Sequence, residues 1–341
     1  MAESRKTFAL GSFEASGEQF PGVVDGDSVY DLRPIISGVR VFADLFEAWE
    51  QNLDTIEAFL KSSPGAEATA EGLRVLPPVQ PVGTVFAAGA NYREHILQIT
   101  AAHKLGRPGA SEKELLEEAA HETDERARTG DPYVWVGIPS AVSGAYDDIV
   151  LPDVGDKLDW EVELAVVIGK HGYRVDATEA MDYVAGYTIC NDLTQRSLVS
   201  RTDMPMMGTD WFRSKNQPGF FPTGPYVLPA RLVQDPADLR ILMTLNGEVK
   251  QDAYVNDLLF NIPQLISYVT AYAAVRPGDI LITGSPAGNG SHWGRFLREG
   301  DVMEATIPGC GTQRTRVVRS SGQLPPWYTN RESHAILSSL D

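Results

Sequence analysis

The sequence predicts an α+β fold, and three segments lead to this prediction. Asn246-Gly247 lies between two short strand-like segments and is the strongest hairpin signal in the chain. Residues 257–275 place apolar side chains along one face of an amphipathic helix. The apolar run at 280–283 follows that helix after a turn and predicts a buried strand. We therefore expect both helices and strands in the main body of the protein.

Composition and charge exclude several classes of protein. The 341 residues suffice for one large domain, or one large and one small, and a hydrophobic fraction of 43% is ordinary for a soluble globular protein. A formal net charge of −17 argues against nucleic acid or anionic membranes as partners. It does not argue against an anionic substrate, because a metal ion and a few basic side chains can invert the field locally.

The sequence also predicts a cytoplasmic protein. The start, MAESRKTFALGSF, lacks the long apolar run of a signal peptide, and no apolar stretch approaches membrane-spanning length. Cys190 and Cys310 are far apart and lie in apolar or glycine-rich surroundings, so we expect reduced, buried thiols.

Residues 1–80 predict a small N-terminal α/β domain. Residues 8–13 and 23–32 have strand character, and residues 41–60 have helical periodicity. A proline-rich stretch at 76–81 predicts a stiff linker. The unit contains no motif, so we expect it to have a structural role.

A run of carboxylates within residues 157–170, KLDWEVELAVVIGK, predicts a metal site. Read as a strand, this segment has Glu161 and Glu163 side by side on one face, and Asp159 shares that face. Adjacent carboxylates on a buried face repel each other and are costly to desolvate. A hard divalent cation, such as Mg²⁺, Mn²⁺ or Ca²⁺, would offset that cost. The alternative is an edge strand whose acidic face is solvated.

A second segment, GYTICNDLTQRSL at 186–198, adds a carboxylate to this site. Residues 187–190 are β-like, and Asn191-Asp192 is a turn-prone pair at their end. Asp192 could therefore reach the same site as the glutamate pair. Arg196 follows one helical turn later, if a helix begins there. The alternative for Asp192 is a helix N-cap.

Together these residues carry a resemblance to the fumarylacetoacetate hydrolase family. The similarity covers roughly residues 83–310, and five segments match in the family's order. They are ANYREH (90–95), LDWEVELAVVIGK (158–170), GYTICNDLTQRSL (186–198), FPTGPYVL (221–228) with Lys215 ahead of it, and residues 245–290, from LNGEVKQDA to RPGDILITGSPAGNG. The resemblance implies a catalytic domain at 83–320 built as a mixed β-roll, or flattened β-barrel, against which the N-terminal domain packs.

The resemblance also implies roles for the motif residues. Glu161, Glu163 and Asp192 would hold the metal, with Mg²⁺ expected first and Mn²⁺ or Ca²⁺ as alternatives. His95 matches the family's water-activating histidine, although a lone histidine is more often a surface or core residue. Other matched positions are Arg196, which would stabilise developing negative charge, Lys215, which would contact the substrate, and the substrate-binding Tyr92, Gly284 and Ser285.

Four positions depart from the family pattern. Gln98 stands where small members have a glutamate that orients and deprotonates the histidine; an amide can hydrogen-bond an imidazole but cannot stabilise imidazolium as a carboxylate does. Gly137 stands where a lysine is usual, and Val199 where some members have a glutamine that helps to stabilise an oxyanion. Ser285 replaces the usual threonine, and either hydroxyl could bind the same oxygen.

Residues 99–131 form a long, highly charged insertion in a region that is normally short in the family. Ser111 with Glu114 resembles a capping box and predicts a helix. We expect a solvated surface helix or a dimer contact. The alternative is a lid that supplies an acid in place of the one missing at Gln98, for which the candidates are Glu117, Glu118, Glu122, Glu125 and also His121.

These residues predict a divalent-metal-dependent hydrolase that cleaves a C–C bond of an acylpyruvate-like 2,4-diketo acid through a metal-stabilised enolate. The resemblance suggests a place in the catabolism of aromatic compounds or sugar acids. The same enolate would serve a decarboxylase of an oxaloacetate-like acid, or an isomerase or tautomerase of a 2-hydroxy-diene-dioate, so both stay as alternatives. A catalytically idle metal-binding homologue is a third. We expect a small anionic 2-keto acid as substrate, a homodimer, and no nucleic-acid or membrane partner.

Overall fold

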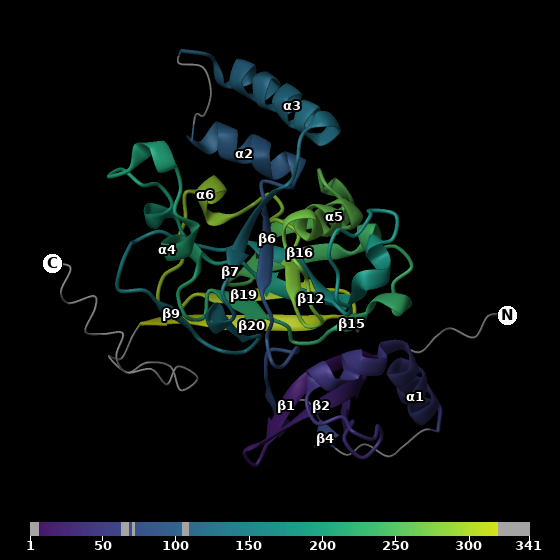
Figure 1. The fold of residues 1–341 in the computed structure, drawn as a ribbon. Helices are drawn as coiled ribbons and strands as arrows, with labels where there is room; N and C mark the ends of the chain where they lie inside the picture. Colours follow the sequence, from purple (N-terminus) through teal and green to yellow (C-terminus); the bar gives the residue numbers. More distant parts are fainter. Residues whose placement is uncertain (1–6, 63–67, 70–71, 104–108, 320–341) are drawn as a thin grey trace.

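The computed structural model describes residues 7–62, 68–69, 72–103 and 109–319. Its N-terminal unit is an antiparallel sheet packed on helix α1 (Trp49–Lys61). The strands run in the order β4 (Ala68–Thr69), β3 (Ser28–Asp31), β2 (Glu18–Asp25), β1 (Ala9–Ala15) and β5 (Arg74–Val75). Figure 1 shows this unit in purple, below the larger domain.

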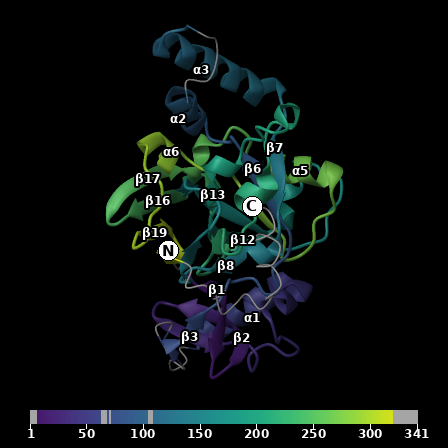
Figure 2. The same ribbon diagram turned by 90° about the vertical axis from the view of Figure 1, so that its left-hand side faces the viewer.

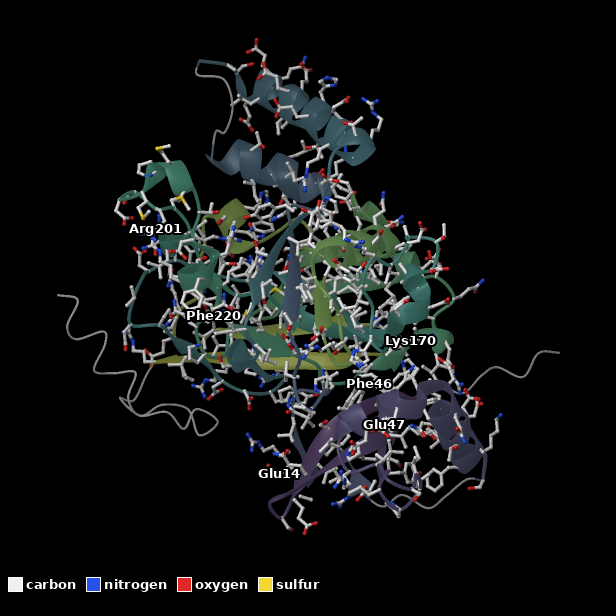
Figure 3. All side chains as sticks on the ribbon, viewed as in Figure 1. Glu14, Phe46, Glu47, Lys170, Arg201 and Phe220 are labelled. Atoms are coloured by element: carbon white, nitrogen blue, oxygen red, sulfur yellow. The ribbon has the colours of Figure 1, made fainter. Side chains whose placement is uncertain are left out.

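The helix predicted over residues 41–60 is interrupted. Phe42–Ala48 form a 3-10 helix, and α1 begins only at Trp49. The rings of Phe42, Phe46 and Trp49 pack against one another at this break. Phe46 lies at the junction with the larger domain, close to Gly278 (Figure 3). Tertiary packing therefore overrides the helical periodicity here.

Two mixed sheets build the larger domain. The first runs in the order β7 (Tyr133–Gly137), β6 (Val85–Gly89), β18 (Ile280–Ile282), β11 (Val162–Ile168), β12 (Val184–Asn191), β14 (Phe221–Thr223) and β8 (Val142–Gly144), with β15 (Leu228–Pro229) also pairing with β12. The second runs β17 (Glu248–Tyr254), β16 (Arg240–Leu245), β19 (Val302–Ile307), β20 (Gly311–Arg319) and β9 (Ile149–Leu151). The two sheets share one hydrophobic core, and the predicted α+β fold with a flattened β-roll is confirmed.

Strand β11 is buried on both faces. Val162, Leu164 and Val166 join the core shared with the second sheet, whereas Val167 joins the core of the N-terminal unit. Glu163 alternates with the first set and therefore lies on the face of Val167, near the beginning of the strand. A carboxylate is thus built into the interior of the sheet.

The structure confirms one local prediction and corrects two. β16 and β17 pair across Asn246-Gly247, where both residues have the positive φ values that this turn requires. Helix α5 (Ile262–Tyr272) is shorter than predicted, because Asn261 caps it. Residues 157–170 do not form one strand, because β10 (Leu158–Asp159) is separated from β11.

A helical hairpin covers the end of the larger domain that faces away from the N-terminal unit. Helices α2 (Arg93–His103) and α3 (Glu112–Thr129) lie there in both views (Figures 1 and 2). The predicted capping box at Ser111 is present at the start of α3. Residues 104–108 of the expected insertion and the tail from 320 lie outside the described residues. Within the described part of the chain, no helix is long and apolar enough to cross a membrane.

Candidate active site

Three carboxylates meet where β11 begins and β12 ends. Glu161 precedes β11, Glu163 lies within it, and Asp192 directly follows β12. The antiparallel register pairs Val162 with Asn191, and the Asp192 backbone N–H donates to the Glu161 carbonyl at 2.8 Å. One oxygen from each carboxylate lies within 4.8 Å of the others, and all three side chains are buried. The chain therefore brings together the three residues that the sequence assigned to a metal.

Two cations, the buried Lys215 and the partly buried Arg196, contact this cluster. The Lys215 ammonium, at the end of α4 (Trp211–Lys215), donates to Glu161 Oε2 at 2.8 Å and also to Asp192. Arg196 donates to the other oxygen of Glu161. Burial alone would raise the pKa of Glu161, but Arg196 and Lys215 hold it well below its usual range. Glu161 is therefore an ionised carboxylate shared by two cations.

The other two carboxylates are less well compensated. Glu163 accepts a hydrogen bond from the Gly284 backbone N–H at 2.7 Å, and burial together with Asp192 and Glu161 raises its pKa. Burial raises the pKa of Asp192 to about 7, although Lys215 opposes the shift. Asp192 Oδ1 has no hydrogen-bond partner among the described residues. The buried oxygen atoms of Glu163 and Asp192 are not fully compensated by positive charge, and a hard divalent cation prefers such oxygen ligands.

Asp159 lies outside the cluster of three carboxylates, although the same Arg196 guanidinium contacts both Asp159 and Glu161. It accepts hydrogen bonds from Arg196 Nε at 2.8 Å and from the backbone N–H groups of Gly290 and Ser291 at the start of α6 (Gly290–Trp293). The strand is interrupted at Trp160 and Glu161, and the Trp160 indole N–H donates to the Gly288 carbonyl. Asp159 therefore holds Arg196 and the start of α6, and it does not contribute to the cluster.

His95, on α2, lies beside the cluster. It is only 4% exposed, and its Nε2 lies 3.9 Å from Glu161 Oε1. Burial lowers the pKa of His95 to about 4, so its imidazole is neutral at physiological pH. Within the described chain its Nδ1 has no hydrogen-bond partner. Gln98 does not support it, because Gln98 Oε1 accepts from the Gly288 backbone N–H at 2.9 Å.

The acids that the alternative, a lid, would have supplied in place of the missing partner are not buried beside His95. Helix α3 turns Leu115, Ala119 and Thr123 inward. The side chains of Glu117, His121, Glu122 and Glu125 are exposed, and Glu118 is only partly buried. The helix instead supports α2, through an ion pair between Arg93 and Asp124 at 2.8 Å.

The predicted substrate-binding residues surround Glu163. Gly284 donates to it directly, and Ser285 follows in the same buried loop. Gly284 has a φ of +104°, and a side chain there would collide with Asn91. Tyr92 is fully buried, and its pKa is raised by burial and by the Glu163 carboxylate.

Sequence reasoning missed several residues that shape the site. Gln251 bonds to Val162 and Ser285, Asn191 Oδ1 accepts from the Glu161 backbone N–H, and the Trp135 ring lies 5.0 Å from the Lys215 ammonium. No local pattern reveals these contacts, because each residue meets a partner that is distant in sequence. At Gly137, where the family lysine is absent, a Cβ atom would lie 2.8 Å from the Phe221 ring.

Comparisons with known proteins show the family to which the chain belongs. The model of the fumarylacetoacetate (FAA) hydrolase C-terminal domain matches residues 84–318. A 2,4-didehydro-3-deoxy-L-rhamnonate hydrolase from Sphingomonas sp. (strain SKA58) is 32% identical over 316 residues, covering 89% of this chain and 94% of the relative.

Solved structures are similar along nearly their whole length. Maleylpyruvate hydrolase from Sphingobium sp. SYK-6 is 26% identical, with a TM-score of 0.69 over 92% of this chain and 100% of its own; one of its structures contains manganese(II) and pyruvate. The 5-carboxymethyl-2-hydroxymuconate delta-isomerase from Mycobacterium smegmatis is 25% identical, with a TM-score of 0.65 over 92% of this chain and 99% of its own. The chain therefore belongs to the fumarylacetoacetate hydrolase family, which includes both hydrolases and isomerases.

Proposed function

We propose that the protein is a metal-dependent hydrolase that cleaves a C–C bond of an acylpyruvate-like 2,4-diketo acid. The observation that carries the proposal is the buried triad of Glu161, Glu163 and Asp192 with His95 beside it. Two relatives support the substrate class. One structure of the Sphingobium hydrolase holds pyruvate, a 2-keto acid, and the Sphingomonas hydrolase acts on an acid whose name denotes oxidation at C2 and C4.

The residues of the site divide the work. A divalent cation held by the triad, which we expect to be Mg²⁺ with Mn²⁺ or Ca²⁺ as alternatives, would polarise the keto acid as a Lewis acid. Arg196 and Lys215 oppose the negative charge that develops during bond cleavage. Neutral His95 accepts a proton from water as that water attacks the acyl carbonyl. Ser285 and the Gly284 loop bind the substrate carboxylate.

One observation favours a second candidate, a decarboxylase or isomerase of a 2-keto acid. His95 Nδ1 has no hydrogen-bond partner among the described residues, and position 98, where the family pattern has a carboxylate, is a glutamine bonded to Gly288. A proton shuttle or the loss of carbon dioxide needs no activated water, so either reaction tolerates this departure. The similarity to the Mycobacterium smegmatis isomerase supports keeping it.

The test is to assay the protein on acetylpyruvate and on oxaloacetate, with Mg²⁺ and with EDTA. Metal-dependent release of pyruvate and acetate from acetylpyruvate supports the hydrolase. Activity on oxaloacetate alone favours the second candidate. Activity that EDTA does not remove contradicts both.

We also infer a homodimer, as the family resemblance implies. The loop before α4 and the start of α4 expose apolar side chains that a second copy could cover, and Arg201 marks this loop in Figure 3. Met206 is fully exposed and Phe212 is 70% exposed. Light scattering at micromolar concentration should give twice the monomer mass, and a monomeric mass contradicts the inference.

A further inference from the structure

We propose that Gln251 is a positioning residue, which turns the Ser285 hydroxyl into a hydrogen-bond donor toward an anionic oxygen of the substrate. The inference rests on the proposed binding of a keto acid beside the carboxylate triad. Gln251 lies in β17, in the second sheet, and it is only 1% exposed. The residues to which its side chain hydrogen-bonds, Val162, Ser285 and Pro286, are all distant from it in sequence.

The contacts fix the orientation of the Gln251 amide. Its Oε1 accepts from the Val162 backbone N–H at 3.0 Å, and its Nε2 donates to the Pro286 carbonyl at 3.0 Å. In a flipped amide, the NH₂ group would face the Val162 N–H and the oxygen would face the Pro286 carbonyl, and both contacts would be repulsive. Nε2 must therefore face Ser285, and it donates to Ser285 Oγ at 3.0 Å.

This donation decides what the serine hydroxyl can do. A hydroxyl carries one hydrogen and can accept through its oxygen. Because Ser285 Oγ accepts a hydrogen bond from the Gln251 NH₂, the hydrogen of the hydroxyl must point away from Gln251, toward another acceptor. In the protein alone it can reach the Pro286 carbonyl at 3.1 Å, which already accepts from Gln251. An anionic oxygen is a stronger acceptor, so a bound carboxylate should take this hydrogen.

The position of the serine makes the donor useful. Gly284, its neighbour, donates to Glu163, so Ser285 adjoins one of the carboxylates that would hold the metal. The other end of the Gln251 amide holds Val162, which lies between Glu161 and Glu163. The Gln251 side chain thus connects the segment that carries Glu161 and Glu163 to the loop that is predicted to bind the substrate carboxylate.

The experiment measures oxalate binding to the Mn²⁺-loaded protein by calorimetry, with Mn²⁺ binding alone measured in parallel. Ser285→Ala should weaken oxalate binding about tenfold or more, the scale of a hydrogen bond to a charged group. Gln251→Met should weaken it similarly in the wild type but by less than about twofold in the Ser285→Ala background, because the pathway through the hydroxyl is already lost. Gln313→Met is the matched control, since Gln313 is a buried glutamine whose amide donates to the Pro222 and Gly224 carbonyls.

Equal weakening by Gln251→Met in both backgrounds, or none in the wild type, overturns the inference. If Gln251→Met fails to fold, Gln251→Glu serves instead, since it keeps an acceptor for Val162 but now accepts the Ser285 hydrogen; its effect should likewise shrink in Ser285→Ala. A wild type that binds Mn²⁺ but no oxalate counts against the inference and the proposed function together. Tight oxalate binding with additive mutations overturns the inference alone.

Discussion

Gln98 accepts a hydrogen bond from the backbone N–H of Gly288 at 2.9 Å, and this bond connects α2 to the loop before α6. The side chain that follows His95 by one helical turn thus holds the helix in place over the site. A structural contact has taken the position where the family resemblance expects an acid.

Replacing that amide by a carboxylate should restore the acid. The introduced carboxylate would keep an acceptor for Gly288, and position 98 lies on the same face of α2 as His95. A nearby carboxylate stabilises imidazolium and raises the pKa of His95. Because the neutral form is the base, the acid limb of the pH dependence of kcat/KM should move to higher pH in Gln98→Glu. Gln98→Met, without charge, should leave the limb unmoved, and an unmoved limb in both variants contradicts the expectation.

The metal site can be tested without a substrate. Glu163→Ala removes one of three clustered carboxylates and should weaken Mg²⁺ or Mn²⁺ binding by more than the roughly 10–100-fold typical of losing an outer-shell partner. Calorimetry measures the affinity, and circular dichroism checks that the fold is intact. Glu304→Ala removes a carboxylate of β19 that pairs with Arg314 at the surface and should change nothing. Unchanged affinity in Glu163→Ala would contradict the assignment of Glu163 as a metal ligand.

The raised pKa values predict how pH and metal act together. Asp192 binds its proton more tightly in the folded state, because its pKa rises from 3.8 to about 7. Without metal, this group therefore makes the protein less stable as pH rises from about 4 to about 7. Metal binding needs the ionised form, so the increase in Tm caused by Mn²⁺ should be larger at about pH 8 than at about pH 5.5. A larger increase at the lower pH contradicts this linkage.

The sequence was sufficient for the triad but not for its surroundings. Glu161 and Glu163 were found because alternate residues of a strand share a face, and Asp192 because a turn-prone pair ended a strand. Asp159 was expected on the same face, but it bonds to Arg196 and the start of α6 instead of joining the cluster, and these partners are distant in sequence. Alternation is a local rule, and it does not predict which partners a side chain meets from distant parts of the chain.

Gln251 shows the same limit more clearly. Nothing in β17 distinguishes it from a solvated polar residue, since its function depends on the packing of the second sheet against Val162 and Ser285. The start of α5, in contrast, could have been predicted from the sequence. Asn261 and Gln264 form a capping box, which marks the start of the helix more closely than the apolar periodicity of residues 257–275 does.

The role of α3 leads to a prediction about stability. Arg126 donates to the Ala90 carbonyl at 2.7 Å, and its guanidinium lies 5.3 Å from the Phe260 ring centre. Ala90 has a φ of +48° at the turn into α2, so this contact supports a strained position. Arg126→Ala should lower the free energy of unfolding by about 1–2 kcal/mol. Asp124→Ala, which breaks only an exposed ion pair with Arg93, should cost under about 1 kcal/mol. Urea denaturation measures the free energy of unfolding of both variants. Equal losses would show that the Arg126 contacts contribute no more to stability than the exposed ion pair.

His95 separates the two candidate chemistries. Hydrolysis requires a base to take a proton from water during attack on the acyl carbonyl, and such assistance is typically worth about a hundredfold to ten-thousandfold in rate. His95 lies 3.9 Å from Glu161 and is the histidine that the motif matches, so His95→Ala should lose turnover of acetylpyruvate on that order. Decarboxylation forms its enolate by losing carbon dioxide, so the same variant should keep most of any activity on oxaloacetate. His171→Ala, at an exposed histidine, controls for the loss of an imidazole. Full hydrolysis of acetylpyruvate by His95→Ala would mean that another group activates the water, and equal losses on both substrates would mean that His95 shapes the site rather than serving as its base.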